Sequence, residues 1–249
     1  TEEIALGTIV GSNISNIALI FGVSLIGYST AINPSSKRNF IALGLSVLVA
    51  IYALSDLIIS KLDSLMLLAV LAYFIYIMAI QPNNNELTVE QNDSSYLNLS
   101  IFLIIGLLSI TIGSNYAVIN GEKIALIIGI PKLIIGLTVL AIGTSLPELA
   151  VTISALMKQK NQMVLGNIIG SNVLNIAVVM PILGLFSTKT FDPSIITRDM
   201  TVMTILSLIF VIIALSFNYK NISISVYRLM GIILVFSYII YIGILGGLL

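Results

Sequence analysis

Glu148 is the carboxylate whose place in the sequence calls for a chemical explanation. It lies in the middle of an apolar segment, whereas the other acidic residues fall in polar connections or near the ends of apolar segments. A charged side chain at the centre of a membrane helix costs about 2.5–3.5 kcal/mol on insertion scales, so it needs an ion, a proton or a polar partner. A protonated glutamate bonded to a neighbouring helix is the simplest alternative to a functional site.

The residues around Glu148 supply further oxygen atoms. Pro147 lacks an N–H and clashes with the carbonyl four residues back, so the helix should break near Gly143. Main-chain oxygens from about Ala141 to Gly143 should then lack helical partners. Four polar side chains at spacings of three or four share one helical face: Thr144, Ser145, Glu148 and Thr152. Such oxygens are the ligands of hard cations such as Ca²⁺, and Na⁺ should use a similar set.

A thirteen-residue element occurs twice in the chain. "LGTIVGSNISNIA" (6–18) and "LGNIIGSNVLNIA" (165–177) align without a gap, with nine identities. Each copy has polar residues spaced by four: Thr8, Ser12 and Asn16 in the first copy, and Asn167, Ser171 and Asn175 in the second. Amide and hydroxyl oxygens are neutral cation ligands, so each copy predicts a helix with one oxygen-bearing face.

Each copy also has two glycines four residues apart, Gly7 and Gly11 in the first and Gly166 and Gly170 in the second. Small residues at this spacing let helices approach closely. Taken alone, the pattern usually reflects packing only. Because the glycines flank the polar residues in both copies, we expect close packing that holds the site together.

The composition places these elements in a lipid bilayer. Hydrophobic residues make up 58% of the chain and charged residues 9%, against roughly 45–50% and 25% in soluble proteins. A membrane-spanning helix needs about 20 mostly apolar residues. The chain divides into eight such segments, approximately 4–28, 40–59, 64–80, 97–119, 133–157, 163–186, 200–217 and 222–249. The predicted fold class is therefore an all-α polytopic membrane protein.

Charge and residue usage exclude several classes of function. The eleven basic and eleven acidic residues cancel, which leaves no electrostatic footprint for nucleic acid. Cysteine and histidine are both absent, so disulfides, thiolate nucleophiles, imidazole bases and the usual zinc and haem sites are excluded. We find no nucleophile beside a base, so an enzyme is not predicted.

The polar connection 81–96 divides the chain into two membrane halves. Residues 1–80 hold about three helices and an incomplete first repeat, and residues 97–249 hold about five helices and the complete second repeat. The element "GTSLPE" (143–148) precedes the second copy, and nothing corresponding precedes the first. We therefore expect an N-terminal truncation, a chain that cannot transport as it stands, and an intact protein of ten helices. Five helices in each half require opposite orientations, as in inverted-repeat transporters.

These motifs resemble those of the cation/Ca²⁺ exchanger superfamily, specifically its prokaryotic sodium/calcium-exchanger-like branch. The resemblance covers essentially the whole chain. It is carried by four segments: "IIGLTVLAIGTSLPELAVTISA", "GNIIGSNVLNI", "GTIVGSNISNI" and "GSNYAVINGEKIALIIGIPK". It implies ten helices in two inverted halves, whose repeats cross at the middle of the membrane and form the cation sites.

By position, the resemblance also implies which residues bind the transported cations. Glu148 would be the principal carboxylate ligand. The remaining implied ligands are hydroxyl, amide and main-chain oxygens of Ala141, Thr144, Ser145, Ser171, Asn175, Ser12 and Asn16. Several exchangers of this branch carry an acid where this chain has Asn175. The site then keeps at most two carboxylates, which balance one Ca²⁺ but leave the usual stoichiometry of three sodium ions to one calcium ion open.

The sequence therefore predicts a secondary active antiporter that exchanges Ca²⁺ for Na⁺ by alternating access, as an integral protein of a prokaryotic cell membrane. No cofactor is expected, and the partners are the lipid bilayer and the transported cations, without nucleic acid or a protein partner. One alternative is a proton/divalent-cation exchanger of the same superfamily, whose repeats usually contain "GNxxE" where this chain has "GNIIG". An ion channel or a non-transporting membrane protein is the alternative from another class.

Overall fold

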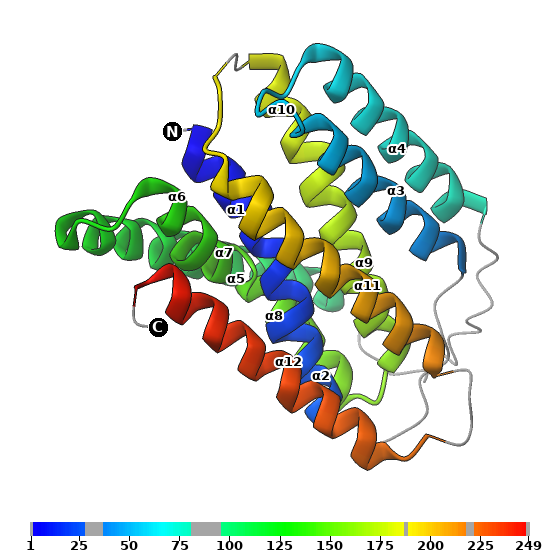
Figure 1. Ribbon diagram of the computed structural model, residues 1–249. Helices are drawn as coiled ribbons and strands as arrows, with labels where there is room; N and C mark the ends of the chain where they lie inside the picture. The colour runs from blue at the N-terminus through cyan, green and yellow to red at the C-terminus, as the bar shows by residue number, and fades with distance from the viewer. Residues whose placement is uncertain (1, 28–36, 81–95, 187–188, 218–221, 248–249) are drawn as a thin grey trace.

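The computed structural model describes residues 2–27, 37–80, 96–186, 189–217 and 222–247, and these residues form helices and short connections without a strand (Figure 1). In chain order the elements, with η marking a π-helical segment, are α1 (Glu2–Ser15), η1 (Asn16–Phe21), α2 (Gly22–Ile26), α3 (Lys37–Ala53), α4 (Lys61–Ile80), α5 (Tyr96–Ile128), α6 (Lys132–Ile135), η2 (Gly136–Leu140), α7 (Ala141–Thr144), α8 (Leu146–Met157), α9 (Asn161–Leu174), η3 (Asn175–Val179), α10 (Met180–Phe186), η4 (Ile195–Met200), α11 (Thr201–Ser216) and α12 (Ile224–Leu245). The predicted all-helical fold is confirmed.

Each of the eight predicted apolar segments corresponds to a helical segment. Seven are long and apolar enough to cross a membrane: Glu2–Ile26, Lys61–Ile80, Ile104–Ile128, Lys132–Met157, Gln162–Phe186, Ile195–Ser216 and Ile224–Leu245. The eighth, α3, has 17 residues, or about 25 Å at 1.5 Å per residue, which is shorter than a bilayer core of about 30 Å. The predicted connection 81–96 lies outside the described residues except for Tyr96.

The start of α4 shows how the sequence sets a helix boundary. The N–H of Asp63 donates to the hydroxyl oxygen of Ser60 (3.2 Å), and the N–H of Ser60 donates to the carboxylate of Asp63 (2.8 Å). These reciprocal bonds form a capping box, which satisfies main-chain donors that the first turn leaves free. Asp63 is therefore buried as a capping group, and its carboxylate does not extend the polar region around Glu148.

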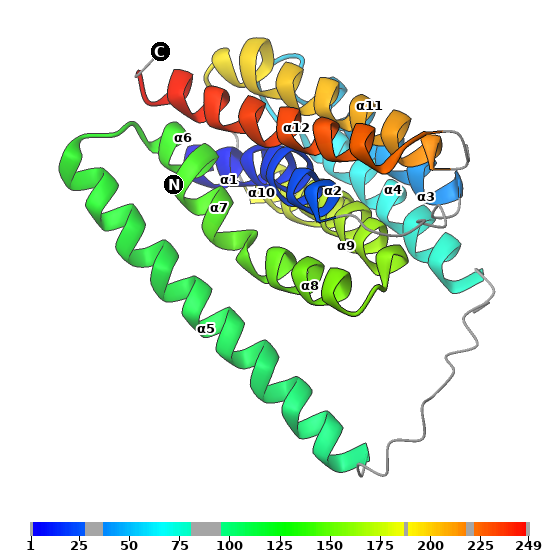
Figure 2. The same cartoon turned by 90° about the horizontal axis from the view of Figure 1, so that it is seen from below.

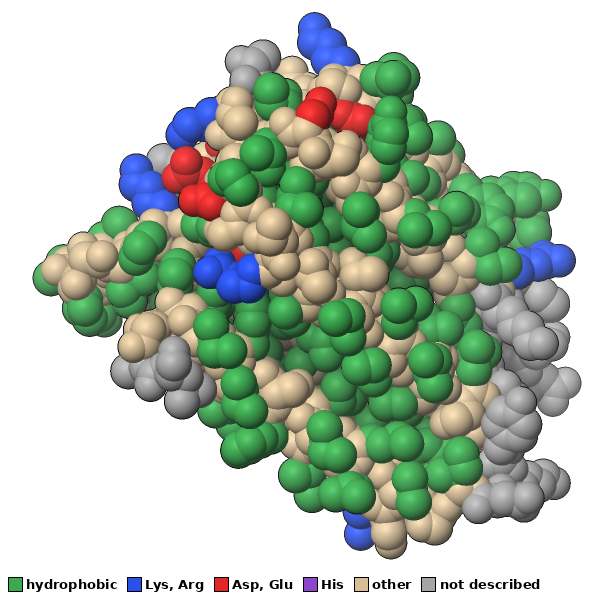
Figure 3. Space-filling view, in the orientation of Figure 1, with side chains coloured by type: hydrophobic (Ala, Val, Ile, Leu, Met, Phe, Trp, Pro, Cys, Tyr) green, Lys and Arg blue, Asp and Glu red, His purple; other side chains and the backbone are tan. Residues whose placement is uncertain are grey.

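The long helix made of α1, η1 and α2 forms the centre of the bundle. Over its apolar window 83% of the residues are buried, whereas the corresponding share for α5 is 6%. Figure 2 shows α5 along one edge of the bundle, with α1 and α2 enclosed by the other helices. In the space-filling view, hydrophobic side chains cover much of the visible face and most charged side chains lie toward its margin (Figure 3). Both features fit a helix bundle that faces lipid.

The first glycine pair packs as expected. A methyl group at Gly7 would lie 2.7 Å from the carbonyl oxygen of Leu133, and one at Gly11 would lie 2.6 Å from that of Leu137. The absence of side chains thus brings α1 against the main chain of α6 and η2. The expectation fails for the second pair, because nothing in the described part of the chain lies within 4 Å of a methyl group at Gly166 or Gly170. That face of α9 is open in this structure.

A second close approach joins α2 to α12. A methyl group at Gly231 would lie 2.5 Å from the carbonyl oxygen of Gly22 and 2.9 Å from Cβ of Leu25. A methyl group at Gly22 would lie 2.9 Å from Cγ2 of Val235. Residues later in α12 contact residues earlier in α2, so the two helices are antiparallel. Their separation is fixed by main-chain atoms, which cannot rotate away.

We expect Gly231→Ala to destabilise the protein, because the added methyl group would force the two helices apart. Overpacking of this kind costs about 1–3 kcal/mol. The matched control is Gly44→Ala in α3, where nothing lies within 4 Å of the added group. Thermal unfolding in detergent should show a lower midpoint for the first variant only. Equal midpoints for the two variants would contradict the close packing of α2 on α12.

Candidate cation site

The break in the helix that carries Glu148 occurs at Ser145, close to the position predicted from Pro147. Element α7 ends at Thr144 and α8 begins at Leu146, with Pro147 in the first turn of α8. Pro147 is tolerated there because first-turn N–H groups have no helical partner. The break lets Thr144 and Ser145 occupy the junction of two helices, one turn before Glu148.

The main-chain oxygens before the break are not unpaired, contrary to the prediction. The N–H of Ser145 donates to the carbonyl oxygens of Ala141 (3.2 Å) and Ile142 (3.1 Å). The hydroxyl of Ser114, in α5, donates to the carbonyl oxygen of Gly143. Hydrogen bonds within the turn at the break and from a neighbouring helix thus satisfy oxygens that the break would otherwise leave unpaired. A carbonyl oxygen has two lone pairs, and the hydroxyl of Thr144 approaches the second one of Ala141 (3.3 Å).

Three helices meet at the Glu148 carboxylate. The hydroxyl of Ser171 in α9 donates to Oε1 of Glu148 (3.0 Å). The amide of Asn16, the first residue of η1, donates to the same hydroxyl oxygen (3.1 Å). The two copies of the repeated element therefore meet beside the carboxylate, as their polar faces predicted.

A second set of contacts joins α1 to the helix break. The hydroxyls of Ser12 and Thr144 lie 2.9 Å apart, and the Thr144 hydroxyl lies 2.8 Å from the carbonyl oxygen of Leu140 and 3.3 Å from that of Ala141. The hydroxyl of Ser15 donates to that of Ser145 (2.9 Å). Hydroxyl groups can reverse the direction of these bonds or turn their lone pairs to a cation.

Seven of the eight predicted residues thus lie in one polar cluster, which we call the oxygen cluster: Ser12, Asn16, Ala141, Thr144, Ser145, Glu148 and Ser171. Asn175 is placed differently, because its amide donates to Oδ1 of Asn13 (3.3 Å). A π-helical segment begins at Asn175, and another at the equivalent Asn16.

Two acceptor atoms of the oxygen cluster are buried without a hydrogen-bond donor. They are Oε2 of Glu148 and Oδ1 of Asn16. A buried acceptor without a partner is costly, and cation coordination satisfies it in the way a donor would. Among the described residues no group of three Asp or Glu side chains is placed to hold a metal ion. The cluster therefore offers one negative charge surrounded by neutral oxygens.

Several polar residues of this region were not predicted as site residues. Asn172 accepts a hydrogen bond from Asn16 (3.0 Å), and Asn13 donates to Sδ of Met203 (3.6 Å). Both belong to the "GSN" part of the repeated element, so the repeat itself held the signal. Ser15 and Ser114 had no such signal, because each reaches the cluster through a contact between distant segments.

Asn167 fixes the turn of α8 that presents Glu148. Its amide donates to the main-chain oxygen of Glu148 (3.0 Å) and to the hydroxyl oxygen of Thr152 (3.2 Å). Thr152 is fully buried, so its hydroxyl depends on this partner. The second repeat thus positions the carboxylate through its main chain as well as through Ser171.

A separate buried carboxylate lies where η4 meets α12. Asp199 is fully buried although the sequence places it at the end of an apolar segment. It accepts hydrogen bonds from the guanidinium of Arg198 (2.7 and 3.1 Å) and from the hydroxyl of Tyr241 (2.9 Å). Its charge and both of its oxygens are thus already paired, so it anchors α12 and does not resemble the unpaired Glu148.

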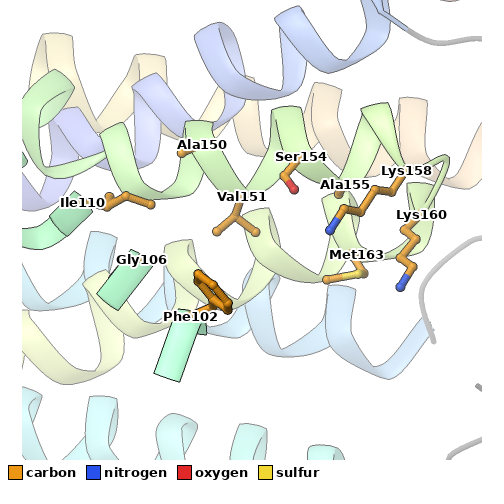
Figure 4. A pocket seen from close by; sticks show the side chains of 10 residues that line it. All are labelled: Phe102, Gly106, Ile110, Ala150, Val151, Ser154, Ala155, Lys158, Lys160 and Met163. Atoms are coloured by element: carbon orange, nitrogen blue, oxygen red, sulfur yellow. The ribbon is translucent and has the colours of Figure 1, made fainter. Parts of the chain in front are cut away.

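A pocket of about 330 Å³ opens between α5, α8 and the start of α9. Figure 4 shows its lining, which is mostly apolar, with Lys158 and Lys160 at one end. It includes none of the eight predicted ligands. Apolar walls and positive charges do not attract a cation, so this pocket is not the cation site.

The chain was compared with known proteins. It matches the family described as sodium/calcium exchanger protein over residues 2–80 and 98–247. It is 35% identical over 224 residues to the inner membrane protein YrbG of Escherichia coli, across 85% of this chain and 69% of that protein. It is 30% identical over 249 residues to the putative antiporter CaxA of Alkalimonas amylolytica, across 96% of this chain and 77% of that protein.

The fold is also similar to that of a solved transporter. A structure of the sodium–calcium exchanger NCX_Mj, soaked with Na⁺ and Sr²⁺, matches with a TM-score of 0.72 at 30% identity. The match covers 97% of this chain and 77% of that chain. The resemblance inferred from the motifs is confirmed, as is the prediction of an integral membrane protein of prokaryotic type that is a transporter and not an enzyme.

We expect Asn167→Ala to destabilise the protein without added cations, because it removes the donor to Glu148 and Thr152. Loss of these bonds in a buried region should cost about 1–3 kcal/mol. The control is Asn120→Ala, whose amide donates to the main-chain oxygen of Tyr116 in its own helix on an exposed face. A lower unfolding midpoint for Asn167→Ala alone is the expected result. Equal midpoints would show that Asn167 does not hold α8 against α9.

Proposed function

The chain belongs to the sodium/calcium exchanger family, and we propose that it exchanges Ca²⁺ for Na⁺ across the membrane as a secondary active antiporter. The observation that carries this proposal is the unpaired carboxylate oxygen of Glu148 inside the oxygen cluster. That carboxylate lies within an apolar segment long enough to cross a membrane. A charge in that position is stabilised by the cation that it binds.

The proposed ligand set is the oxygen cluster together with Asn175, the eight residues expected from the sequence. Ca²⁺ takes six to eight oxygen ligands. The cluster can supply a similar number: a carboxylate oxygen of Glu148, an amide oxygen of Asn16, the main-chain oxygen of Ala141, and hydroxyls of Ser12, Thr144, Ser145 and Ser171. Asn175 would join this ligand set after its side chain rotates away from Asn13, to which it now donates a hydrogen bond. Because Na⁺ would use the same carboxylate, occupancy by one ion excludes the other, which is the basis of exchange.

A second carboxylate is part of the proposal. Gly166 and Gly170 repeat the motif that seats α6 and η2 on Gly7 and Gly11, yet their face of α9 is open in the described structure. A further broken helix of the "GTSLPE" type would fit there by the same close approach and would bring its own glutamate. We also propose the organisation into halves 1–80 and 97–249 joined by 81–96. Two carboxylates would balance the charge of one Ca²⁺.

Transport by alternating access requires the oxygen cluster to open to each side of the membrane in turn. We propose that one pair of helices slides past the remaining bundle. The low burial of α5 supports this, because a helix with few buried residues can slide with little loss of packing. Its contact with the helix break through Ser114 would couple such movement to the site.

In proteoliposomes that contain the full-length protein, an outward Na⁺ gradient should drive uptake of radiolabelled Ca²⁺. Glu148→Gln should abolish this uptake, because an amide keeps the shape of the side chain but removes its charge. Glu122→Gln is the matched control, since it removes a carboxylate of α5 outside the oxygen cluster. Normal uptake in Glu148→Gln would refute the assignment of the site.

The same vesicles separate sodium coupling from proton coupling. With Na⁺ absent on both sides, an imposed pH gradient should drive no Ca²⁺ uptake. Uptake under those conditions would replace the proposal with proton/divalent-cation exchange. Competition by Mn²⁺ and Mg²⁺ in the sodium-driven assay would define the selectivity, which depends on cavity size and rigidity.

A further inference from the structure

The pocket between α5, α8 and the start of α9 is a groove that opens where two helices separate. A methyl group at Gly121 of α5 would lie 2.5 Å from Cγ1 of Val139, and one at Gly143 would meet the side chain of Val118. These contacts show that α5 packs closely on η2 and α7 and runs antiparallel to them. Earlier in α5 the helices part, because nothing in the described part of the chain lies within 4 Å of a methyl group at Gly106. The pocket of about 330 Å³ occupies this gap.

The walls of the groove are mostly apolar over a length close to the depth of one bilayer leaflet. The α5 wall consists of Phe102, Gly106 and Ile110, which are four residues apart and share one face of the helix. The α8 wall consists of Ala150, Val151, Ser154 and Ala155. From Phe102 to Ile110 the helix rises about 12 Å, whereas half of a bilayer core of about 30 Å is about 15 Å. A groove of this length suits the acyl chain of a lipid.

Two lysines lie at one end of the groove. Lys158 and Lys160 fall between the apolar segments Lys132–Met157 and Gln162–Phe186, so they lie where the chain leaves the membrane. Figure 4 shows both lysines at one end of the pocket and Ile110 at the other. The charged end is therefore at the level of the lipid headgroups, and the apolar walls extend from it into the membrane.

The positive charge at this end is not neutralised within the described part of the chain. The ion pairs among the described residues join Lys189 to Glu3 and Arg198 to Asp199, and neither lysine of the groove takes part in them. Element α9 begins directly after Lys160 and has no acidic residue in its first turn. The positive end of its dipole therefore adds to the charge of the two lysines. Such an end attracts an anionic group.

We propose that this groove is a binding site for one anionic phospholipid. The phosphate of the lipid contacts Lys158 and Lys160, and one acyl chain fills the groove between α5 and α8. Basic pockets between transmembrane helices bind anionic headgroups, whereas a zwitterionic lipid carries an ammonium group that the lysines repel. A soluble anion would leave the apolar walls unfilled. The site is separate from the oxygen cluster and does not depend on exchange activity.

A lipid in this position supplies packing that α5 lacks. Only 6% of the apolar window of α5 is buried, so few side chains fix its distance from α8. An acyl chain between Phe102 and Val151 contacts both helices at once. Bound anionic lipid should therefore stabilise the folded protein, beyond the effect of lipid that only covers its surface.

The test is thermal unfolding of the purified full-length protein in neutral detergent, with added phosphatidylglycerol or with phosphatidylcholine of the same acyl chains. Phosphatidylglycerol should raise the unfolding midpoint more than phosphatidylcholine does, because a ligand that binds the folded state stabilises it. For Lys158→Gln combined with Lys160→Gln, we expect the phosphatidylglycerol concentration that gives half of the effect to rise at least fivefold. The matched control is Lys123→Gln combined with Lys132→Gln, two exposed lysines outside the groove, which should leave that concentration unchanged.

Gly106→Leu tests the apolar part of the site. Its side chain would occupy the space of the acyl chain, so it should remove most of the selective stabilisation by phosphatidylglycerol. The midpoint without lipid should not fall, because the described structure leaves room there and leucine favours a helix more than glycine does. The matched control is Gly113→Leu, at an exposed position of α5 that also has nothing within 4 Å and does not line the pocket.

Four results would overturn the proposal. Equal stabilisation by the two lipids would show that the headgroup charge is not recognised, and an unchanged titration in the Lys158 and Lys160 variant would place the lipid elsewhere. Equal stabilisation by inorganic phosphate would indicate a site for a free anion. A lower midpoint of Gly106→Leu without lipid, with Gly113→Leu unchanged, would show that another segment of the full-length chain fills the groove. These measurements report binding alone, so they hold whether or not exchange is observed.

Discussion

The packing of α1 on the broken helix through Gly7 and Gly11 is the contact on which the oxygen cluster depends. Hydrogen bonds between Ser12 and Thr144 and between Ser15 and Ser145 form only when two helix axes come unusually close. Side chains larger than hydrogen at either glycine would meet carbonyl oxygens of α6 and η2. In lipid, where apolar burial gives little preference for one helix contact over another, such close main-chain approach selects the arrangement.

The position of Glu148 is set by three separate constraints. Pro147 starts α8 immediately before it, Asn167 holds its main-chain oxygen, and Ser171 donates to one of its carboxylate oxygens. The other carboxylate oxygen remains buried and unpaired. Asp199 shows the contrast, because Arg198 and Tyr241 pair its charge and both of its oxygens. The difference between the anchoring Asp199 and Glu148, the proposed cation ligand, lies in what their surroundings leave unsatisfied.

Much of the oxygen cluster was predictable from the sequence pattern alone. The repeat located Ser12, Asn16 and Ser171, and an acid inside an apolar span located Glu148. Asn175 lies outside the oxygen cluster in this structure, because its amide donates to Asn13 of the other repeat copy. The burial of Asp199 was missed because its tyrosine partner lies 42 residues away on another helix. Periodicity describes one regular helix, so it fails where contacts join distant segments.

By itself, the sequence determined the surroundings of the protein, a lipid bilayer, and the chemical type of its ligand atoms. A chain with 58% hydrophobic residues belongs in lipid, and without cysteine or histidine it offers oxygen atoms as ligands for a cation. The tertiary structure decided which oxygens meet and which remain free. It left Oε2 of Glu148 unpaired and satisfied the carbonyl oxygens at the break. Composition and spacing are local properties, whereas the pairing of a buried polar atom depends on which distant segment packs against it.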